Sequence, residues 1–174
     1  MKKTWPIWIA ATIALTAVFH ILTILALPYG IMDRAMAGIS GQAGGVNKPL
    51  YPDQPTAESR SIVRPSPDLL YTACAYDVSD RPLKLTSPVP DTYWSLSAFA
   101  ANTDNFFVVN DRQANNKKVE IILATDKNDA LSSNIPVVIT PTTKGIVLFR
   151  SLVSSEDERA RIDSLRRQSN CEPL

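Results

Sequence analysis

A stretch without a single charged side chain, residues 5–27, constrains this chain more than any other feature of its 174 residues. From Trp5 to Leu27 the sequence is rich in Ile, Leu, Ala and Val and contains no Asp, Glu, Lys or Arg. A helix of this length, rising about 1.5 Å per residue, measures roughly 35 Å, against a hydrocarbon core of about 30 Å. The stretch therefore predicts a helix that spans a membrane once, with some tilt.

The flanking charges predict the orientation of this helix. Lys2 and Lys3 precede it, whereas the first charges that follow it, Asp33 and Arg34, cancel. Cytoplasmic flanks carry the excess of Lys and Arg. The N-terminus is therefore predicted to be cytoplasmic, and everything after Pro28 is predicted to lie across the membrane.

A cleaved signal peptide is the alternative to an anchor. Residues 35–37, Ala-Met-Ala, resemble a cleavage site. However, the apolar stretch is longer than the roughly 7–15 residues of a signal h-region, and ten residues separate its end from Gly38. An uncleaved anchor over residues 1–28 is the favoured prediction.

The exported part is almost neutral and divides into a linker and a domain. Removing the two N-terminal lysines from the 18 basic residues leaves 16 against 17 acidic ones. This balance provides no basic surface for nucleic acid. Residues 29–58 are Gly-rich and then Pro-rich and polar, which predicts a juxtamembrane linker. Residues 59–174 form the predicted exported domain.

This domain is predicted to be mainly β, an antiparallel sandwich or a partly open barrel. Apolar and polar side chains alternate in short runs. Turn-forming residues separate these runs, for example near residue 130. Regular spacing of short strands argues against βαβ units. Strands are expected at 69–78, 83–86, 93–100, 106–109, 119–124, 136–140 and 146–153, with a turn at 127–134.

One helix is predicted to close the chain. Ser155 and Glu158 have the spacing of a capping box, and basic residues lie near the expected last turn. The apolar side, mainly Ile162 and Leu165, is narrow. The helix is therefore expected on the surface of the sheet.

Two cysteines, Cys74 and Cys171, are the only ones in the chain. The predicted orientation places both on the oxidising side of the membrane, where disulfides form and persist. We expect a disulfide between them; two separate buried thiols are the alternative.

Residues 63–112, VRPSPDLLYTACAYDVSDRPLKLTSPVPDTYWSLSAFAANTDNFFVVNDR, also carry a family resemblance. Their Arg-Pro-x-Pro-Asp-x-Leu-Tyr run, Asp-Val-Ser step and Tyr-Trp-Ser strand followed by Asn-Thr resemble the bacterial domain-of-unknown-function family DUF1254. The resemblance extends more loosely over residues 45–150. It implies an envelope-facing β domain anchored in a bacterial inner membrane, with the domain in the periplasm, and it implies no particular activity.

Two polar segments are candidate binding elements. In the first, Pro65 and Pro67 stiffen the chain between Arg64 and Asp68, so that Arg64 can either form structural ion pairs or bind an anionic group. In the second, residues 102–112, polar clusters flank a short apolar strand; side-chain-stabilised turns are the structural interpretation. The predicted binding residues are Arg64, Asp68, Tyr71, Tyr93, Trp94, Asn102, Asp104, Asn105 and Arg112, expected to meet at one end of the sheet.

Catalytic chemistry is narrowed by what the sequence lacks. The one histidine, His20, lies in the apolar stretch, which removes imidazole catalysis and imidazole metal sites from the domain. No phosphate-binding loop, dinucleotide motif or Cys-x-x-Cys is present, so no cofactor and no metal are expected. A carboxylate pair that hydrolyses a glycan or ester could be drawn from Asp68, Asp77, Asp91, Asp104 and Asp111.

The favoured function is a non-catalytic, membrane-anchored module that binds a partner or an unidentified small ligand, with the hydrolase as the alternative. Within the apolar stretch, polar residues recur at helical spacing and form one stripe. This stripe, Thr12, Thr16, His20 and Thr23, could dock on a second copy or on another membrane protein; a lone anchor is the alternative.

Overall fold

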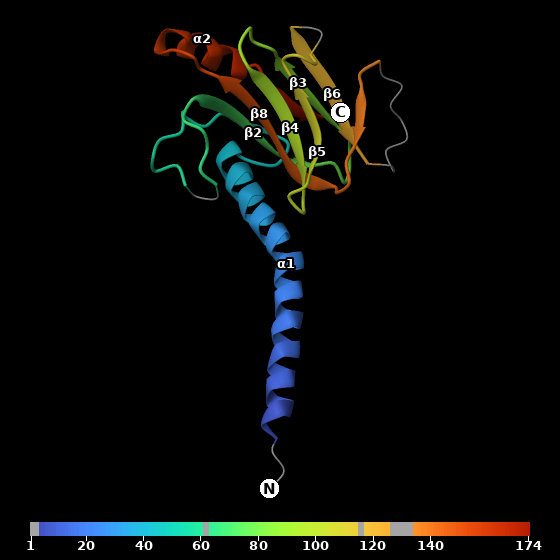
Figure 1. The fold of residues 1–174 in the computed structure, drawn as a ribbon. Coiled ribbons are helices and arrows are strands. Elements are labelled where there is room, and N and C mark those ends of the chain that lie inside the picture. The colour runs from blue at the N-terminus through green and yellow to red at the C-terminus, as the bar shows by residue number, and fades with distance from the viewer. Residues whose placement is uncertain (1–3, 61–62, 115–116, 126–133) are drawn as a thin grey trace.

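A computed structural model of the protein describes residues 4–60, 63–114, 117–125 and 134–174. Figure 1 shows one long helix leading into a β domain. Lys2, Lys3 and most of the turn predicted at 127–134 lie outside the described residues. The elements are α1 (Trp5–Ala43), β1 (Pro49–Leu50), β2 (Leu69–Asp77), β3 (Leu83–Pro88), β4 (Trp94–Ala100), β5 (Asn105–Asn110), β6 (Lys118–Ala124), β7 (Val137–Ile139), β8 (Lys144–Leu152), α2 (Glu156–Arg166) and β9 (Asn170–Pro173).

Two sheets form the β domain. One has the strand order β1-β2-β8-β4-β5 and the other the order β7-β6-β3-β9. All described neighbours pair antiparallel except β6 and β7, which are parallel. The prediction of a mainly β fold with one N-terminal and one C-terminal helix is confirmed. The two short edge strands β1 and β9 were not predicted, because neither shows alternation over enough residues.

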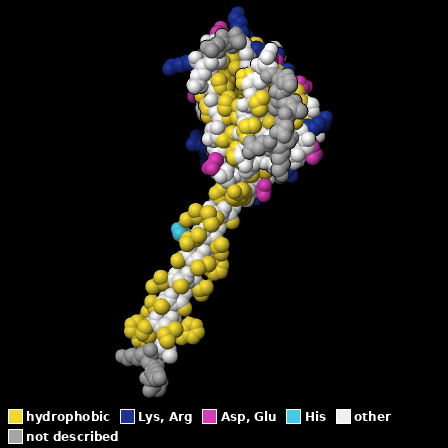
Figure 2. Space-filling view, turned by 90° about the vertical axis from the view of Figure 1, so that its right-hand side faces the viewer, with side chains coloured by type: hydrophobic (Ala, Val, Ile, Leu, Met, Phe, Trp, Pro, Cys, Tyr) yellow, Lys and Arg dark blue, Asp and Glu magenta, His cyan; other side chains and the backbone are white. Residues whose placement is uncertain are grey.

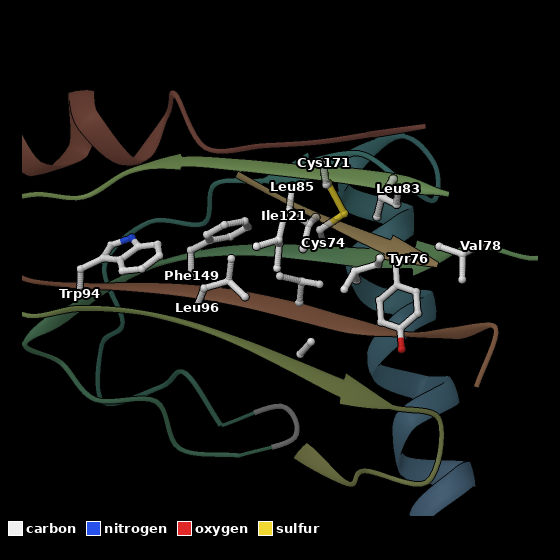
Figure 3. Close-up of a cluster of buried hydrophobic side chains, with 13 residues drawn as sticks. Cys74, Tyr76, Val78, Leu83, Leu85, Trp94, Leu96, Ile121, Phe149 and Cys171 are labelled. Carbon is white, nitrogen blue, oxygen red and sulfur yellow. A yellow bond between two sulfur atoms is a disulfide. The ribbon is translucent and has the colours of Figure 1, made fainter. Parts of the chain in front are cut away.

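The core lies between the two sheets, where alternate residues of facing strands meet. On β4, Trp94 and Leu96 point inward and pack with Phe149 of β8 and with Leu85 and Ile121 of the other sheet (Figure 3). Each of these side chains is almost fully removed from water. Burial of a side chain of this kind contributes about 1.5–3 kcal/mol.

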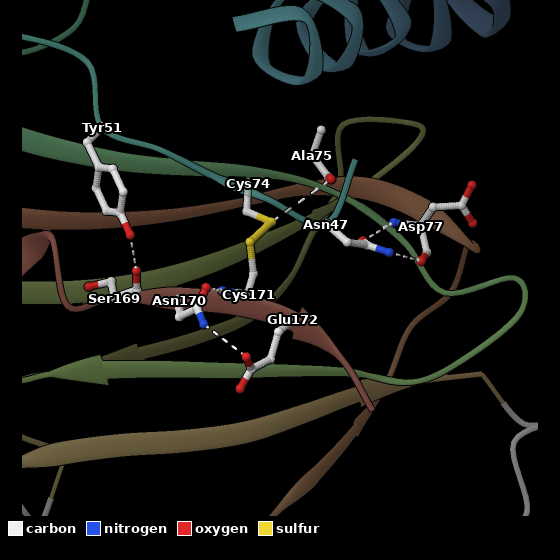
Figure 4. The surroundings of a disulfide bond; sticks show 9 residues. All are labelled: Asn47, Tyr51, Cys74, Ala75, Asp77, Ser169, Asn170, Cys171 and Glu172. Atoms are coloured by element: carbon white, nitrogen blue, oxygen red, sulfur yellow. Dashed lines mark hydrogen bonds between the residues drawn. A yellow bond between two sulfur atoms is a disulfide. The ribbon is translucent and has the colours of Figure 1, made fainter. Parts of the chain in front are cut away.

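A disulfide joins the two sheets inside this core. Cys74 of β2 and Cys171 of β9 are bonded, with their Cα atoms 6.7 Å apart and a sequence separation of 97. Both residues are buried, and Figure 4 shows the bond crossing from one layer to the other. The predicted disulfide is confirmed.

Gly145 of β8 lets the Tyr76 side chain and the Phe99 carbonyl approach the β8 backbone closely. A Cβ at this position would lie against the carbonyl oxygen of Phe99 and 2.6 Å from the hydroxyl of Tyr76. The tyrosine ring occupies that space, and its hydroxyl donates to the Phe99 carbonyl over 3.3 Å. Burial raises the pKa of Tyr76 to about 12, so the hydroxyl keeps the proton that it donates.

α1 is much longer than the predicted membrane helix. It continues to Ala43, so the expectation of a linker over residues 29–58 is wrong for its first half. An 18-residue window of α1 has a mean hydropathy of 2.2 and no buried residue, which makes the helix long and apolar enough to cross a membrane. Pro28 lies inside α1, and a helical proline removes one backbone hydrogen bond and bends the axis. Figure 1 shows α1 bent between its outer part and the part beside the sheets.

Packing against the sheets explains why the glycine-containing half of α1 is helical. Met32 is buried, and Ala35, Met36 and Ile39 on the same side are partly buried. This half of α1 contacts β1, β2 and β8. Such packing outweighs the roughly 1 kcal/mol that each helical glycine costs relative to alanine.

The chain after α1 is held on β2. The side chain of Asn47 donates to the carbonyl oxygen of Asp77 and accepts from its backbone N–H, both over 2.8 Å (Figure 4). β1 then pairs with Cys74 and Ala73. The β domain therefore begins well before residue 59, and it is joined to α1 by only a few residues.

α2 begins at the predicted place but without the predicted cap. Ser155 is the N-cap residue, yet its side chain makes no capping hydrogen bond, and Glu158 pairs with Arg161 instead. Ile162 is fully buried. α2 contacts β2, β3 and β8, and Figure 1 shows it at the end of the domain away from the outer part of α1.

Candidate functional site

The predicted binding residues do not form one site. Residues 64–68 precede β2, whose first residue pairs with Leu152, whereas residues 102–104 follow Ala100, which pairs with Gly145. These two positions are seven residues apart along β8, or about 23 Å at roughly 3.3 Å per residue. The expectation that the two polar segments meet is therefore wrong. We call the end next to α2 the distal end and the end with the β4–β5 turn the proximal end.

The proximal residues build a turn. The side chain of Asn102 donates to Asp104 over 2.5 Å, and the backbone N–H of Asp104 donates to the Asn102 side-chain oxygen over 3.2 Å. Thr103 between them has a φ of 72°, in the left-handed region. Asn105 is exposed at the start of β5. The geometry matches the structural interpretation of this segment as a side-chain-stabilised turn.

Trp94 is a core residue, although it was predicted as a wall of the binding site. Its side chain is only 1% exposed, and it lies next to Phe149 (Figure 3). Tyr93, one position earlier, faces the opposite side of the sheet and is 45% exposed. Successive side chains of a strand point to opposite faces, so Trp94 is buried while the adjacent Tyr93 is exposed.

A polar row crosses the outer face of the larger sheet at its distal end. Strand pairing places Tyr71 of β2 opposite Arg150 of β8, Arg150 opposite Ser95 of β4, and Ser95 opposite Asn110 of β5. The hydroxyl of Tyr93 donates to Ser95 over 3.1 Å, which brings this ring to the same row. We call Tyr71, Tyr93, Ser95, Asn110 and Arg150 the polar row.

Arg150 is the member of the polar row that sequence reasoning missed. It is partly buried on the strand that sends Val147 and Phe149 into the core, and no hydrogen bond or ion pair joins its guanidinium to the described parts of the chain. A charged residue directly after the apolar run Ile146–Phe149, at an outward position of the strand, was the available signal. An unpaired, partly buried guanidinium whose strand neighbours are Tyr71 and Ser95 is suited to a planar anionic group.

The other charged candidates at the distal end are exposed. Within the described residues, the side chains of Arg64, Asp68 and Arg112 make no hydrogen bond and no ion pair. The structural ion pairs considered for Arg64 and Asp68 are thus not formed there. Tyr71 ties the segment of Arg64 and Asp68 to the polar row, because the Tyr71 hydroxyl accepts from the backbone N–H of Ser66 over 2.9 Å.

A second concentration of charge lies between α2 and β2, around Arg166. This side chain is 3% exposed, pairs with Asp163 at 2.5 Å, and donates to the carbonyl oxygen of Tyr71. Arg167 pairs with the other carboxylate oxygen of Asp163 over 2.7 Å. Beside them is a depression of about 560 Å³ that also contacts Leu70. Since Arg166 is paired and buried, its arrangement fits a structural role.

An apolar groove marks the open side of the sandwich, between β5 and β6. It has a volume of about 410 Å³, and Figure 2 shows hydrophobic side chains gathered in a depression on this face. Its apolar lining includes Phe107, Val109 and Val119, which also pack against the core. The groove is therefore the exposed margin of the core.

Two of the five candidate carboxylates are held by salt bridges. Asp77 accepts from the backbone N–H and hydroxyl of Ser79 and pairs with Lys144 at 3.3 Å. Burial acts to raise the pKa of Asp77, but the bonds from Ser79 and Lys144 outweigh it and lower the pKa. Asp91 pairs with Arg161 at 2.7 Å, and the hydrogen bond from that arginine lowers its pKa. Lowered pKa values do not suit a general acid.

The remaining carboxylates do not form a catalytic pair either. Asp104 is held in the proximal turn, and Asp111 accepts from the backbone N–H of Trp94 over 3.3 Å. Asp68 alone of the five has no side-chain partner among the described residues. In the same part of the chain, no group of three or more His, Cys, Asp or Glu residues could hold a metal ion.

The fold defines a class of protein: a disulfide-linked, two-sheet β sandwich carried on one long, apolar N-terminal helix. The chain belongs to the DUF1254 family, described as proteins of unknown function, whose family model matches residues 46–173. The resemblance inferred from residues 63–112 is confirmed. A comparison with curated proteins finds no match.

Solved structures that share the fold include two bacterial proteins. The VPA0106 protein from Vibrio parahaemolyticus is 17% identical, with a TM-score of 0.63 over 88% of this chain and 38% of its own. A putative uncharacterized protein from Burkholderia cenocepacia is 16% identical, with a TM-score of 0.52 over 84% of this chain and 40% of its own. This chain thus spans less than half the length of either protein.

Proposed function

We propose that this chain is a single-pass protein of a bacterial inner membrane, with a cytoplasmic N-terminus and a periplasmic β domain that acts as a non-catalytic binding module. One observation carries the proposal: the apolar part of α1 continues as the same helix into a domain whose two sheets are joined by a buried disulfide. A disulfide of this kind persists on the oxidising side of a membrane, and the apolar half of α1 has the length to cross one.

The binding surface in this proposal is the polar row at the distal end. The unpaired guanidinium of Arg150, together with the exposed Arg64 on the adjoining segment, favours a ligand or partner with an anionic group. α1 packs on the domain from the other direction, so the distal end points away from the membrane. Hydrolysis is the weaker alternative, since four of its five candidate carboxylates are already engaged.

The topology is tested on membranes that contain the full chain. The protein should resist alkaline extraction, should keep its N-terminal residues on sequencing, and should expose the β domain to protease added from the periplasmic side. A mature protein that begins at Gly38, or a β domain protected from periplasmic protease, would contradict the anchor.

Anion recognition is tested by affinity capture from membranes solubilised in mild detergent. Arg150→Ala should reduce the captured material at least tenfold, because a charge-assisted hydrogen bond of about 1.5–3 kcal/mol is lost. Lys84→Ala is the control, since it removes one positive charge from the opposite sheet, where Lys84 pairs with Glu120. Added salt should release the captured material from the wild type.

Two results would count against this proposal. Equal capture by the wild type and Arg150→Ala would exclude the polar row as the binding surface. Turnover of an envelope glycan or ester by the wild type, abolished by Asp68→Asn, would establish the hydrolase instead.

A further inference from the structure

One side of α1 carries a row of polar and small residues that only Leu27 interrupts. Beginning at Thr12, positions spaced by three or four follow the helical repeat of 3.6 and stay on the same side over the whole helix. We call this side the stripe face; it consists of Thr12, Thr16, His20, Thr23, Leu27, Gly30, Arg34, Gly38 and Gly41.

Two polar side chains of the stripe face have no partner. Thr12 and Thr23 donate to the carbonyl oxygens of Trp8 and Phe19, one turn earlier, over 2.9 and 2.8 Å. The Thr16 hydroxyl and the His20 ring make no hydrogen bond within the described residues. In a membrane both lie near the middle of the apolar segment, where lipid offers no partner and such groups face other protein.

The β domain leaves the stripe face open. The side of α1 that packs on the sheets carries Met32 and Ile39, whereas Gly30, Arg34 and Gly38 lie on the opposite side. A Cβ added to Gly30 or Gly38 would meet no atom within 4 Å, so neither glycine is required by the packing of this chain. A second helix could therefore approach closely along the stripe face without displacing the domain.

We propose that the stripe face joins two copies of this chain into a parallel dimer within the membrane. Each β domain then lies on the side of its own α1 that faces away from the other copy. The inference rests on the membrane orientation proposed above. A twofold axis along the membrane normal places the stripe face of one copy against the same face of the other. His20 of each copy can then bond Thr16 of the other.

The charges beside the membrane favour a second copy as the occupant. Asp33 and Arg34 make no ion pair within the described residues, and Arg34 lies on the stripe face. Across the twofold axis, Arg34 of one copy can reach Asp33 of the other, and the reciprocal pair forms by symmetry. A self-complementary surface of this kind is what a twofold interface requires.

The dimer is tested by oxidative crosslinking of single introduced cysteines in native membranes, where the native disulfide leaves no other thiol free. Ile9→Cys and Leu27→Cys, on the stripe side, should give a band of twice the mass. Ala14→Cys, Ile21→Cys and Leu25→Cys, on the opposite side, should give at least tenfold less. His20→Leu in the Leu27→Cys background should weaken dimerisation about three- to tenfold.

Phe19→Leu, beside His20 but without a polar group to remove, is the matched control and should leave the crosslinking unchanged. Uniform crosslinking, crosslinking confined to the opposite side, or stripe-side adducts of another mass would each overturn the dimer. Alkaline extraction and periplasmic proteolysis of the same membranes distinguish this failure from that of the proposed topology, because a correctly inserted but monomeric chain passes both tests.

Discussion

Removal of the Cys74–Cys171 disulfide is expected to lower the free energy of unfolding of the β domain by about 4–5 kcal/mol. The bond closes a loop of 97 positions, and the entropy that such a loop removes from the unfolded chain corresponds to this value. It also ties β9 to the opposite sheet, where the pairing of β9 with β3 involves only four residue pairs. The midpoint of thermal unfolding should fall by roughly 15 °C.

The measurement compares the full chain in detergent as wild type, as reduced wild type and as Cys74→Ala/Cys171→Ala. Near-ultraviolet circular dichroism follows Trp94, which is buried among core side chains. Reduction keeps the volume of the two cysteine side chains, whereas the double variant removes both sulfur atoms. The difference in unfolding free energy between the reduced wild type and the double variant therefore measures the cost of the cavity. A reductant that exposes both thiols without shifting the midpoint would contradict the expected role of the bond.

Arg166→Ala is expected to destabilise the β domain by about 3 kcal/mol, whereas Arg167→Ala costs about 1 kcal/mol or less. Both arginines bind Asp163, but the Arg166 side chain is 3% exposed and that of Arg167 is 52% exposed. Loss of Arg166 leaves the carbonyl oxygen of Tyr71 without its donor and opens a buried space, as happens when one partner of a buried pair is removed. An exposed pair contributes little. Denaturant unfolding of the two variants measures the contrast.

The same cluster gives stability a dependence on pH. Burial acts to raise the pKa of Asp163, but hydrogen bonds from Arg167 and Arg166 outweigh it and hold the pKa below the ordinary value. A carboxylate with a lowered folded-state pKa contributes its full stabilisation above its unfolded-state pKa and loses it as the pH falls toward the folded-state value. Acidification should therefore destabilise the wild type more than Arg166→Ala. Equal acid sensitivity of the wild type and Arg166→Ala, or equal destabilisation by Arg166→Ala and Arg167→Ala, would contradict the stabilising role of the buried Arg166–Asp163 pair.

Local pattern was sufficient to predict most of the secondary structure. Alternation over several residues, as in β4 and β6, reports directly which side of a strand is buried, and it located seven strands to within about two residues. The cysteine count and the apolar stretch likewise predicted the disulfide and the long N-terminal helix. Periodicity and the apolar stretch are properties of neighbouring residues, and the disulfide could be predicted because the chain has only two cysteines.

Strand pairing decided what the candidate site contains. The sequence places Asp68 and Asn102 each at the end of a strand, but only the register of β2, β8 and β4 shows that these are opposite ends of the sheet. The same register brings Tyr71, Arg150 and Ser95 together from three distant segments.

Burial of the helical elements was also decided by tertiary contacts. Residues 29–43 have the glycine content of a linker, yet packing against β2 holds them in α1. Arg166 has the character of a surface residue, yet its side chain donates to the carbonyl oxygen of Tyr71, on a strand 95 positions away in the sequence. A residue's own type and its near neighbours determine periodicity and compartment, whereas pairing and burial depend on distant segments that meet only in the folded chain.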